Sequence, residues 1–482
     1  MKLLNLLQKL EIIPFVKKRN LLNFILGAID LFTLIVIFQI AFYVLRPGNE
    51  PIFLLNAQYS ALFIYMLPSW ILVLHICNLV QIPRTSRYSR LFLEYMQFTV
   101  LNLIILYIYY YVFKLDTISS AFIVLFSLIG LLVLYFVRII EFKLFKWYRA
   151  NGYNYVNVIL IADESSISFI NELLSKKEWG YQILLIFSDS KKLKKLFRSK
   201  IKILPEKSVT SIKNLLEIDI VDEVLFLKDE IDSKNARDYI RSCEEVGVVF
   251  RLKTSSSSFL TNGRFSKIGN MMFLTFVNIP TNSFGLAFKS SMDIYFSALM
   301  IILISPVMLT IALIILVTSP GPVFFRQARV GLRGRQFYLY KFRTMVVNAE
   351  QLKKELEEKN EMDGPVFKIK EDPRITSIGK VLRKTGLDEL PQLFNVLKGE
   401  MSLIGPRPPL QSETIQYKRW QLRRLSVKPG ITCSWQVIPD RNSVKFDKWM
   451  KLDLDYIDNW SPMLDFTLLI KTLRTVIHRT GN

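Results

Sequence analysis

Long uninterrupted apolar segments are the feature that most limits what this 482-residue chain can fold into. Four of them lie in its first third, at roughly Leu21 to Leu45, Ala61 to Val80, Leu91 to Phe113 and Ala121 to Ile140. Each is long enough to cross a hydrocarbon layer of about 30 Å as an α-helix. We therefore expect residues 1–150 to form a four-helix transmembrane domain.

Clusters of basic residues flank these segments and predict their orientation. They are Lys17, Lys18 and Arg19 before the first segment, Arg84, Arg87 and Arg90 after the second, and Arg138, Lys143, Lys146 and Arg149 at the end of the fourth. By the positive-inside rule both ends of the bundle face the cytoplasm. The segments carry few charges apart from Asp30, which argues against a transporter.

The formal charge of +22 limits the class of partner. No zinc-ligand spacing, basic zipper or RNA-binding aromatic signature accompanies it, so a nucleic-acid partner is not expected. Anionic membrane lipid and phosphate-rich substrates explain the charge better. The chain has only two histidines, at opposite ends, which makes histidine-based catalysis improbable.

Short β-rich runs replace the apolar segments from about Tyr153. We predict strands at Val156 to Ile161, Tyr181 to Phe187, Glu223 to Leu227 and Val246 to Leu252, with helices such as Ser168 to Lys176 between them. This alternation predicts a parallel, Rossmann-like α/β domain over residues 151–285. It lacks a G-x-G-x-x-G motif and a Tyr-x-x-x-Lys pair, which disfavours an NAD-dependent oxidoreductase, dehydratase or epimerase and favours a structural or regulatory role.

A fifth apolar stretch, Ile294 to Val317, has basic residues on both sides. If it crossed the bilayer, everything after Pro320 would lie outside the cytoplasm, against the positive-inside rule. Ser305-Pro306 lies near its middle, where proline bends a helix and the serine hydroxyl can bond a carbonyl that proline leaves unpaired. We expect a re-entrant helix that enters and leaves on the same face. A kinked spanning helix is the alternative.

Charged motifs crowd together after this helix. Lys341 and Arg343 lie in Lys-Phe-Arg-Thr-Met, which has the alternation of a strand; Arg383 and Arg407 follow further on. Asp388 and Glu389 are adjacent carboxylates among these cations. Such a pair can bind Mg²⁺, and an aspartate can attack phosphorus while arginines bind the phosphate oxygens. This set of residues favours phosphoryl transfer.

From about Ser291 onward the chain resembles the polyprenyl-phosphate hexose-1-phosphate transferases, the monotopic phosphoglycosyl transferases of the bacterial sugar transferase family. The matching motifs are KFRTM, DGPVFKI, DPRIT, IGKVLRKTGLDELPQLFNVLKGEMSLIGPRP, KPGIT and SWQV. The preceding four-helix and α/β regions resemble the large subclass of that family. The resemblance implies a catalytic domain over residues 286–482, with the re-entrant helix at 294–317.

The resemblance also implies a reaction and its residues. Asp388 matches the nucleophile that attacks a UDP-sugar, expels UMP and passes the sugar phosphate to undecaprenyl phosphate, and Glu389 its partner in metal or proton handling. Lys341, Arg343, Arg383 and Arg407 match phosphate-binding positions, and Ser305 and Pro306 match the helix breaker.

The family resemblance also predicts the cellular location, the oligomeric state and the pathway. It implies the bacterial inner membrane, a catalytic domain on its cytoplasmic face, a homodimer, and initiation of capsule, exopolysaccharide or O-antigen synthesis. Gly386 departs from the family, which often has serine there. The rival reading is a non-catalytic membrane scaffold or regulator of polysaccharide assembly.

Overall fold

The computed structural model describes most of the chain. The described residues are 19–45, 51–77, 79, 84–85, 88–205, 212, 215–216, 219–229, 233–254, 264–277, 280, 283–349, 351–352, 369, 372–438 and 444–477. The DGPVFKI motif lies almost wholly outside them.

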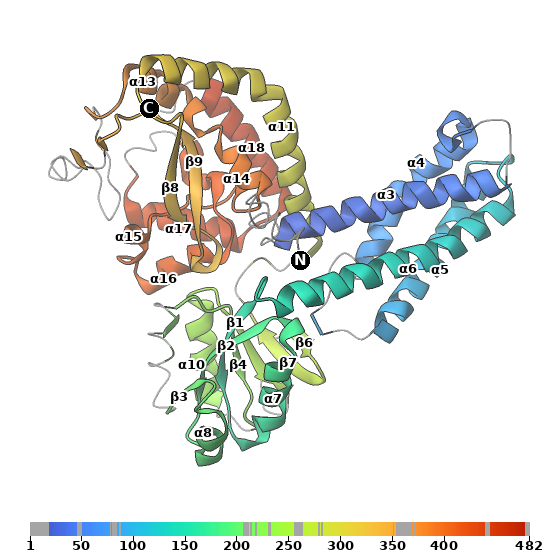
Figure 1. Cartoon of the computed structure of the whole chain (residues 1–482), viewed down its shortest axis with the longest axis horizontal. Helices are drawn as coiled ribbons and strands as arrows, with labels where there is room; N and C mark the ends of the chain where they lie inside the picture. The colour runs from blue at the N-terminus through green and yellow to red at the C-terminus, as the bar shows by residue number, and fades with distance from the viewer. Residues whose placement is uncertain are drawn as a thin grey trace.

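Four helices at the start of the chain form one bundle, which extends away from both globular domains (Figure 1). They are α3 (Arg19–Leu45), α4 (Ala57–Ile76), α5 (Tyr88–Val112) and α6 (Ser120–Ala150). By length and composition, four stretches of the described chain could cross a membrane: Ala57–Leu74, Tyr88–Val112, Ser120–Ala150 and Phe288–Thr318. Within α3, Ile29–Leu45 is a shorter apolar stretch. The chain is thus a membrane protein, as the sequence predicts.

Aromatic side chains fill the core of the bundle. The Phe38 ring centroid lies 4.7 Å from that of Phe53, 5.1 Å from Phe63, 5.0 Å from Phe122 and 5.2 Å from Phe126. These tilted and edge-on arrangements are the ones that aromatic quadrupoles favour. Rings from α4, α6 and the 3₁₀ turn Phe53–Leu55 thereby pack on the Phe38 side chain of α3.

The charge that the sequence analysis noted inside the first helix has a partner. Arg138 of α6 donates from Nη2 to Asp30 Oδ2 at 2.8 Å and lies 3.1 Å from Glu141 Oε2. Its Nε donates to the Tyr95 hydroxyl at 2.9 Å. All four side chains are buried, as charges within a membrane bundle must be paired to persist.

A seven-stranded mixed sheet follows, in the order β3-β2-β1-β4-β5-β7-β6. Its strands are β1 (Val156–Ile161), β2 (Tyr181–Phe187), β3 (Lys202–Leu204), β4 (Glu223–Phe226), β5 (Val249–Lys253), β6 (Arg264–Ile268) and β7 (Met271–Phe276). Strands β1 to β5 run parallel to one another, and β7 is antiparallel to both β5 and β6. Helices α7 (Ile167–Ser175), α8 (Lys191–Phe197) and α10 (Ser233–Glu244) connect strands. The predicted alternation of strand and helix is confirmed.

The next element, α11 (Ser283–Thr318), is the longest helix and carries the fifth apolar stretch. Figure 1 shows that it runs along the edge of the following domain and then bends across it. Pro306 lies inside the helix and, having no N–H, leaves the carbonyl of Ile302 without its helical donor. The Ser305 hydroxyl donates to that carbonyl at 2.8 Å and so replaces the missing N–H donor, as the sequence predicts.

The last domain is built on a long hairpin and a set of short elements. The strands are β8 (Phe324–Val330), β9 (Gln336–Phe342), β10 (Ser402–Ile404) and β11 (Gly430–Thr432). The helices are α13 (Ser377–Thr385), α14 (Gln392–Leu397), α15 (Gln411–Thr414), α16 (Arg419–Leu422), α17 (Phe446–Asp458) and α18 (Pro462–Ile477). Several small apolar clusters hold these elements together, and one of them includes residues of α11.

Candidate active site

Asp388 and Glu389 lie in a single 3₁₀ turn, Leu387–Glu389, between α13 and α14. Thr376 caps the start of α13, where its Oγ1 accepts from Gly379 N at 3.1 Å. Gly386 ends the helix in the left-handed region at φ 71°. The apolar neighbours of the pair, Leu387 and Leu390, pack against α11. The turn therefore presents Asp388 beside the apolar helix.

Burial and charge act against each other at Asp388, whose exposed fraction is 7%. Loss of hydration raises the pKa of its carboxyl to about 6, Glu389 adds to the rise, and Lys341 and Arg383 oppose it. A carboxylate with this pKa is ionised at neutral pH and is more basic than an exposed aspartate. This combination suits a nucleophile.

Lys341 reaches the pair from β9. Its Nζ donates to Glu389 Oε1 at 2.6 Å, so the structure brings this lysine to the carboxylate pair. That it binds phosphate stays a prediction. Asn395 supports the same strand from α14: its Oδ1 accepts from Tyr340 N at 3.0 Å and its Nδ2 donates to Tyr338 O at 2.7 Å. The buried amide thus fixes the strand that carries Lys341.

Arg383 lies one helical turn before the pair, on the last turn of α13. Its Nε donates to Thr344 Oγ1 at 3.0 Å, which joins the helix to the Lys-Phe-Arg-Thr-Met segment. A Cβ at Gly379 would lie 2.1 Å from the carbonyl oxygen of Thr344. Only glycine lets α13 approach that segment so closely.

Arg343 contacts the end of α11. The strand ends at Phe342, and the buried guanidinium of Arg343 donates to the carbonyls of Ser319 and Pro320 at 2.6 and 2.7 Å. These carbonyls follow α11, so Arg343 anchors the end of the apolar helix to the residues that follow β9. That it binds phosphate stays a prediction.

Arg407 follows β10 and has an oxygen partner. Its Nη1 lies 3.4 Å from Glu413 Oε2, and a quarter of its side chain is exposed. Arg329, which the sequence analysis counted only as a basic flank, lies beside it. Its Nη1 donates to Pro408 O at 3.1 Å, and burial together with Arg407 lowers its pKa to about 10, with Glu413 and Glu389 opposing. Arg329 lies in β8 outside any recognisable motif, so the sequence did not indicate that it lies near Glu389.

The site offers limited ligands for a metal ion. Within the described part of the chain, no three His, Cys, Asp or Glu side chains gather as a metal site. Mg²⁺ often takes one or two carboxylates and completes its coordination with substrate phosphates and water. Asp388 and Glu389 fit that pattern, although Lys341 already contacts Glu389.

The Asp-Pro-Arg motif has a structural role. Arg374 donates to Asp372 through Nε at 2.8 Å and Nη2 at 2.6 Å, and its Nη1 reaches Ala349 O at 3.1 Å. Both charged residues are buried. The motif therefore holds the segment after Lys-Phe-Arg-Thr-Met against the start of α13.

Comparison with known proteins assigns this domain. Residues 284–479 match the family model described as bacterial sugar transferase, and residues 75–226 match one described as a CoA-binding domain. Among curated relatives, the galactosyl transferase CpsE of Streptococcus agalactiae is 36% identical over 350 residues, 70% of this chain and 76% of that protein.

Two further relatives carry related names. A UDP-glucose:undecaprenyl-phosphate glucose-1-phosphate transferase of Klebsiella pneumoniae is 32% identical, covering 68% of this chain and 69% of that protein. An undecaprenyl-phosphate galactose phosphotransferase of Salmonella typhimurium is 42% identical, covering 40% of this chain and 41% of that protein. The chain belongs to the bacterial sugar transferase family.

Proposed function

We propose that this enzyme transfers a hexose-1-phosphate from a UDP-sugar to undecaprenyl phosphate and releases UMP. The observation that carries the proposal is the buried Asp388 carboxylate, which lies beside the apolar helix α11 and within the electrostatic influence of Lys341 and Arg383. The names of the relatives from Klebsiella and Salmonella support the carrier. The relatives' names differ in the sugar, so glucose, galactose and an N-acetylated hexose all stay candidates.

The reaction proceeds in two displacements at one phosphorus atom. An Asp388 oxygen attacks the β-phosphorus of the UDP-sugar, the bond from that phosphorus to the bridging oxygen breaks, and UMP leaves with the electron pair. A phosphate oxygen of the carrier then attacks the same phosphorus and the bond to Asp388 breaks. The product is a lipid-linked diphosphate sugar, and the carboxylate is regenerated.

The surrounding cations give this anionic reaction a favourable field. Lys341 and Arg383 lie near Asp388, Arg329 interacts with Glu389, and Arg407 lies beside Arg329. We assign them to the diphosphate oxygens, whose charge grows as UMP leaves. Mg²⁺, when held by Asp388 and Glu389, would supply further neutralisation of the diphosphate charge.

The placement of α11 supports a re-entrant helix. Near its start, Lys289 contacts Asp465 at 2.7 Å; near its end, Ile311 and Ile315 pack on Phe342 and Leu382. Both ends therefore bind the same globular domain, whereas a straight span would place its ends on opposite sides of the bilayer. Large apolar side chains around the bend, such as Ile302 at 70% and Leu309 at 64%, are exposed where lipid would cover them.

This placement suits a lipid substrate. A helix that enters one leaflet holds the catalytic turn at the headgroup layer, where the carrier's phosphate lies. We further propose that the site faces the cytoplasm at the bacterial inner membrane, that the enzyme is a homodimer, and that it initiates capsule, exopolysaccharide or O-antigen synthesis. The parallel strand order β3-β2-β1-β4-β5 supports a Rossmann-like central domain.

UMP release by the purified full-length protein tests the proposal. The assay contains Mg²⁺, undecaprenyl phosphate and a panel of UDP-sugars, and it compares the natural protein with Asp388→Asn and with Asp447→Asn, whose carboxylate is exposed. We expect one sugar to give UMP, Asp388→Asn to lower the rate by at least about a thousandfold, and Asp447→Asn to have no effect. Without the carrier, a single turnover should leave the sugar phosphate covalently on the protein. Failure of every sugar with folded protein would favour the scaffold reading.

A further inference from the structure

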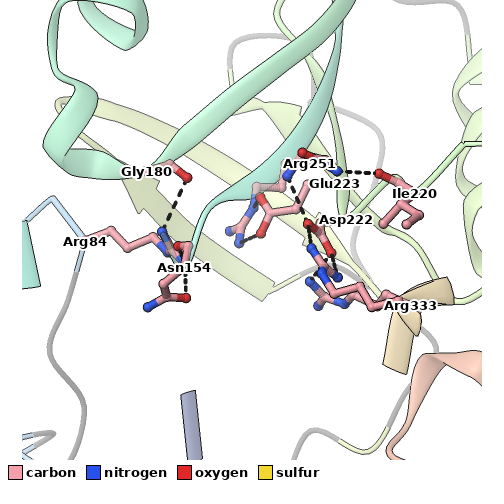
Figure 2. Close-up of polar contacts among 10 residues, drawn as sticks. Arg84, Asn154, Gly180, Ile220, Asp222, Glu223, Arg251 and Arg333 are labelled. Atoms are coloured by element: carbon pink, nitrogen blue, oxygen red, sulfur yellow. Dashed lines mark hydrogen bonds and ion pairs between the residues drawn. The ribbon is translucent and has the colours of Figure 1, made fainter. Parts of the chain in front are cut away.

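The turn of the β8–β9 hairpin contacts a buried carboxylate of the α/β domain (Figure 2). Asp222, with an exposed fraction of 1%, lies directly before β4. Arg335 donates to its two oxygens at 2.9 and 2.6 Å, and Arg333 donates to Oδ1 at 3.0 Å. Both arginines lie at the hairpin turn. The turn of the catalytic hairpin is therefore fixed to the central sheet.

The surroundings of Asp222 are built for this contact. Burial on its own would raise the pKa of the carboxyl, but Arg335 and Arg333 hold it below its usual range. Asn157 N also donates to Asp222 Oδ2 at 2.9 Å, which ties the carboxylate to β1. The adjacent Glu223 is paired with Arg251 at 2.8 Å. A buried carboxylate with charged partners on both sides is costly to leave unpaired.

The hairpin leads from this turn to the catalytic residues. Along β8, Val330 N donates to Pro409 O at 2.9 Å, and the preceding Arg329 binds Pro408 O. Along β9, the strand runs from the turn to Lys341, which contacts Glu389. A two-stranded hairpin is marginally stable alone, so its geometry depends on what holds its ends.

The edge of the sheet formed by the amino-terminal ends of β1, β2 and β4 also contacts the membrane domain. Arg84, which follows the second transmembrane helix, donates to Trp179 O at 3.1 Å and to Asn154 O at 3.0 Å. Asn154 precedes β1, whose second residue is Asn157. Figure 2 shows Arg84 and Arg333 reaching neighbouring parts of this edge. The edge thus lies between a membrane loop and the catalytic hairpin.

We propose that Asp222 is a positioning residue of the transferase: by binding Arg333 and Arg335 it holds the hairpin so that Arg329 and Lys341 lie correctly at the Asp388–Glu389 pair. The α/β domain then contributes to the reaction through the position of the hairpin. The effect on turnover rests on the proposed function, whereas the effect on the hairpin does not.

The test uses full-length Asp222→Asn in detergent, with two readouts. Hydrogen exchange should be faster in the hairpin, both at the turn and in the segment that contains Lys341. Turnover for UMP release should fall about tenfold, since small misplacements at a reacting centre have large effects on rate. Glu245→Gln is the matched control, because its 2.9 Å pair with Arg419 also joins the two domains but includes no residue of the hairpin.

The pairing itself is tested by a double variant. If Asp222 acts through Arg335, adding Arg335→Gln to Asp222→Asn should lower turnover by no more than about twofold further. Unchanged exchange near Lys341, or an equal loss of turnover in Glu245→Gln, would overturn the proposal. If the natural protein releases no UMP, the proposed function fails, and the exchange measurement still decides whether Asp222 orders the hairpin.

Discussion

At the residue scale, the setting of Asp388 predicts how activity depends on pH. Burial raises the pKa of this carboxyl to about 6, while Lys341 and Arg383 pull it down. Attack requires the ionised form, so kcat/KM for the UDP-sugar should rise with pH through about 6 and then level off. Initial rates between pH 5 and 8 measure this limb.

Substitution of Lys341 tests whether the titration of Asp388 causes this pH dependence. Lys341→Gln removes the strongest influence that lowers the pKa, so the limb should move to higher pH in addition to any loss of rate. Lys384→Gln, on an exposed position of α13, is the control and should leave the limb in place. If the rise of kcat/KM with pH does not move in Lys341→Gln, the titrating group is not Asp388. Stability changes in the opposite sense: a raised carboxyl pKa makes protonation near pH 6 stabilising.

At the scale of elements, the end of α13 depends on the one departure from the family pattern that lies in the site. Gly386 has φ 71°, and a Cβ there would meet no atom within 4 Å. Gly386→Ala should therefore cost about 1 kcal/mol through backbone strain alone, lowering the apparent melting temperature by a few degrees. Gly130→Ala, also in open space but without positive φ, should cause no such loss. Equal effects would mean that strain at φ is not the cause.

The topology of α11 makes a second prediction at this scale. Ser291→Cys and Ala328→Cys are exposed positions on either side of the apolar stretch, and Asp116→Cys lies in the loop after α5. In inverted membrane vesicles, an impermeant maleimide should label the first two and spare the third, since a re-entrant helix keeps both its ends inside. Each new cysteine is introduced into a parent variant in which the three natural buried cysteines have been replaced. Protection of position 328 would instead support a kinked span.

Local elements were predictable where the pattern of the sequence depends on near neighbours. The strands Val156–Ile161 and Tyr181–Phe187 occur with the predicted bounds, because a buried parallel strand is a continuous apolar run. The hydroxyl of Ser305 bonds the carbonyl that Pro306 leaves free. In contrast, Arg343 donates hydrogen bonds to two carbonyls after the end of α11. The alternation of residues along a strand cannot predict such a contact.

At the scale of the whole molecule, the contacts between domains were beyond sequence reasoning. Asp222 is one ordinary acidic residue before a strand, and its partners Arg333 and Arg335 lie more than a hundred residues away. Nothing local distinguishes a carboxylate that joins two domains from one on a solvated surface. The candidate pair Asp388 and Glu389 was predicted from its motif, and of the cations near it Arg383 is close in sequence, whereas Lys341 lies 48 residues from Glu389.

The membrane bundle shows the same dependence on distant partners, and it yields the last prediction. Arg138 joins the first and last helices of the bundle through Asp30, with Glu141 beside it. Arg138→Gln should destabilise the protein in detergent by about 3–5 kcal/mol because two buried carboxylates lose their counter-charge. Arg90→Gln is the matched control: its pair with Glu94 is exposed and is worth at most about 1 kcal/mol. Adding Asp30→Asn to Arg138→Gln should restore part of the loss, and a strictly additive double variant would contradict the pairing.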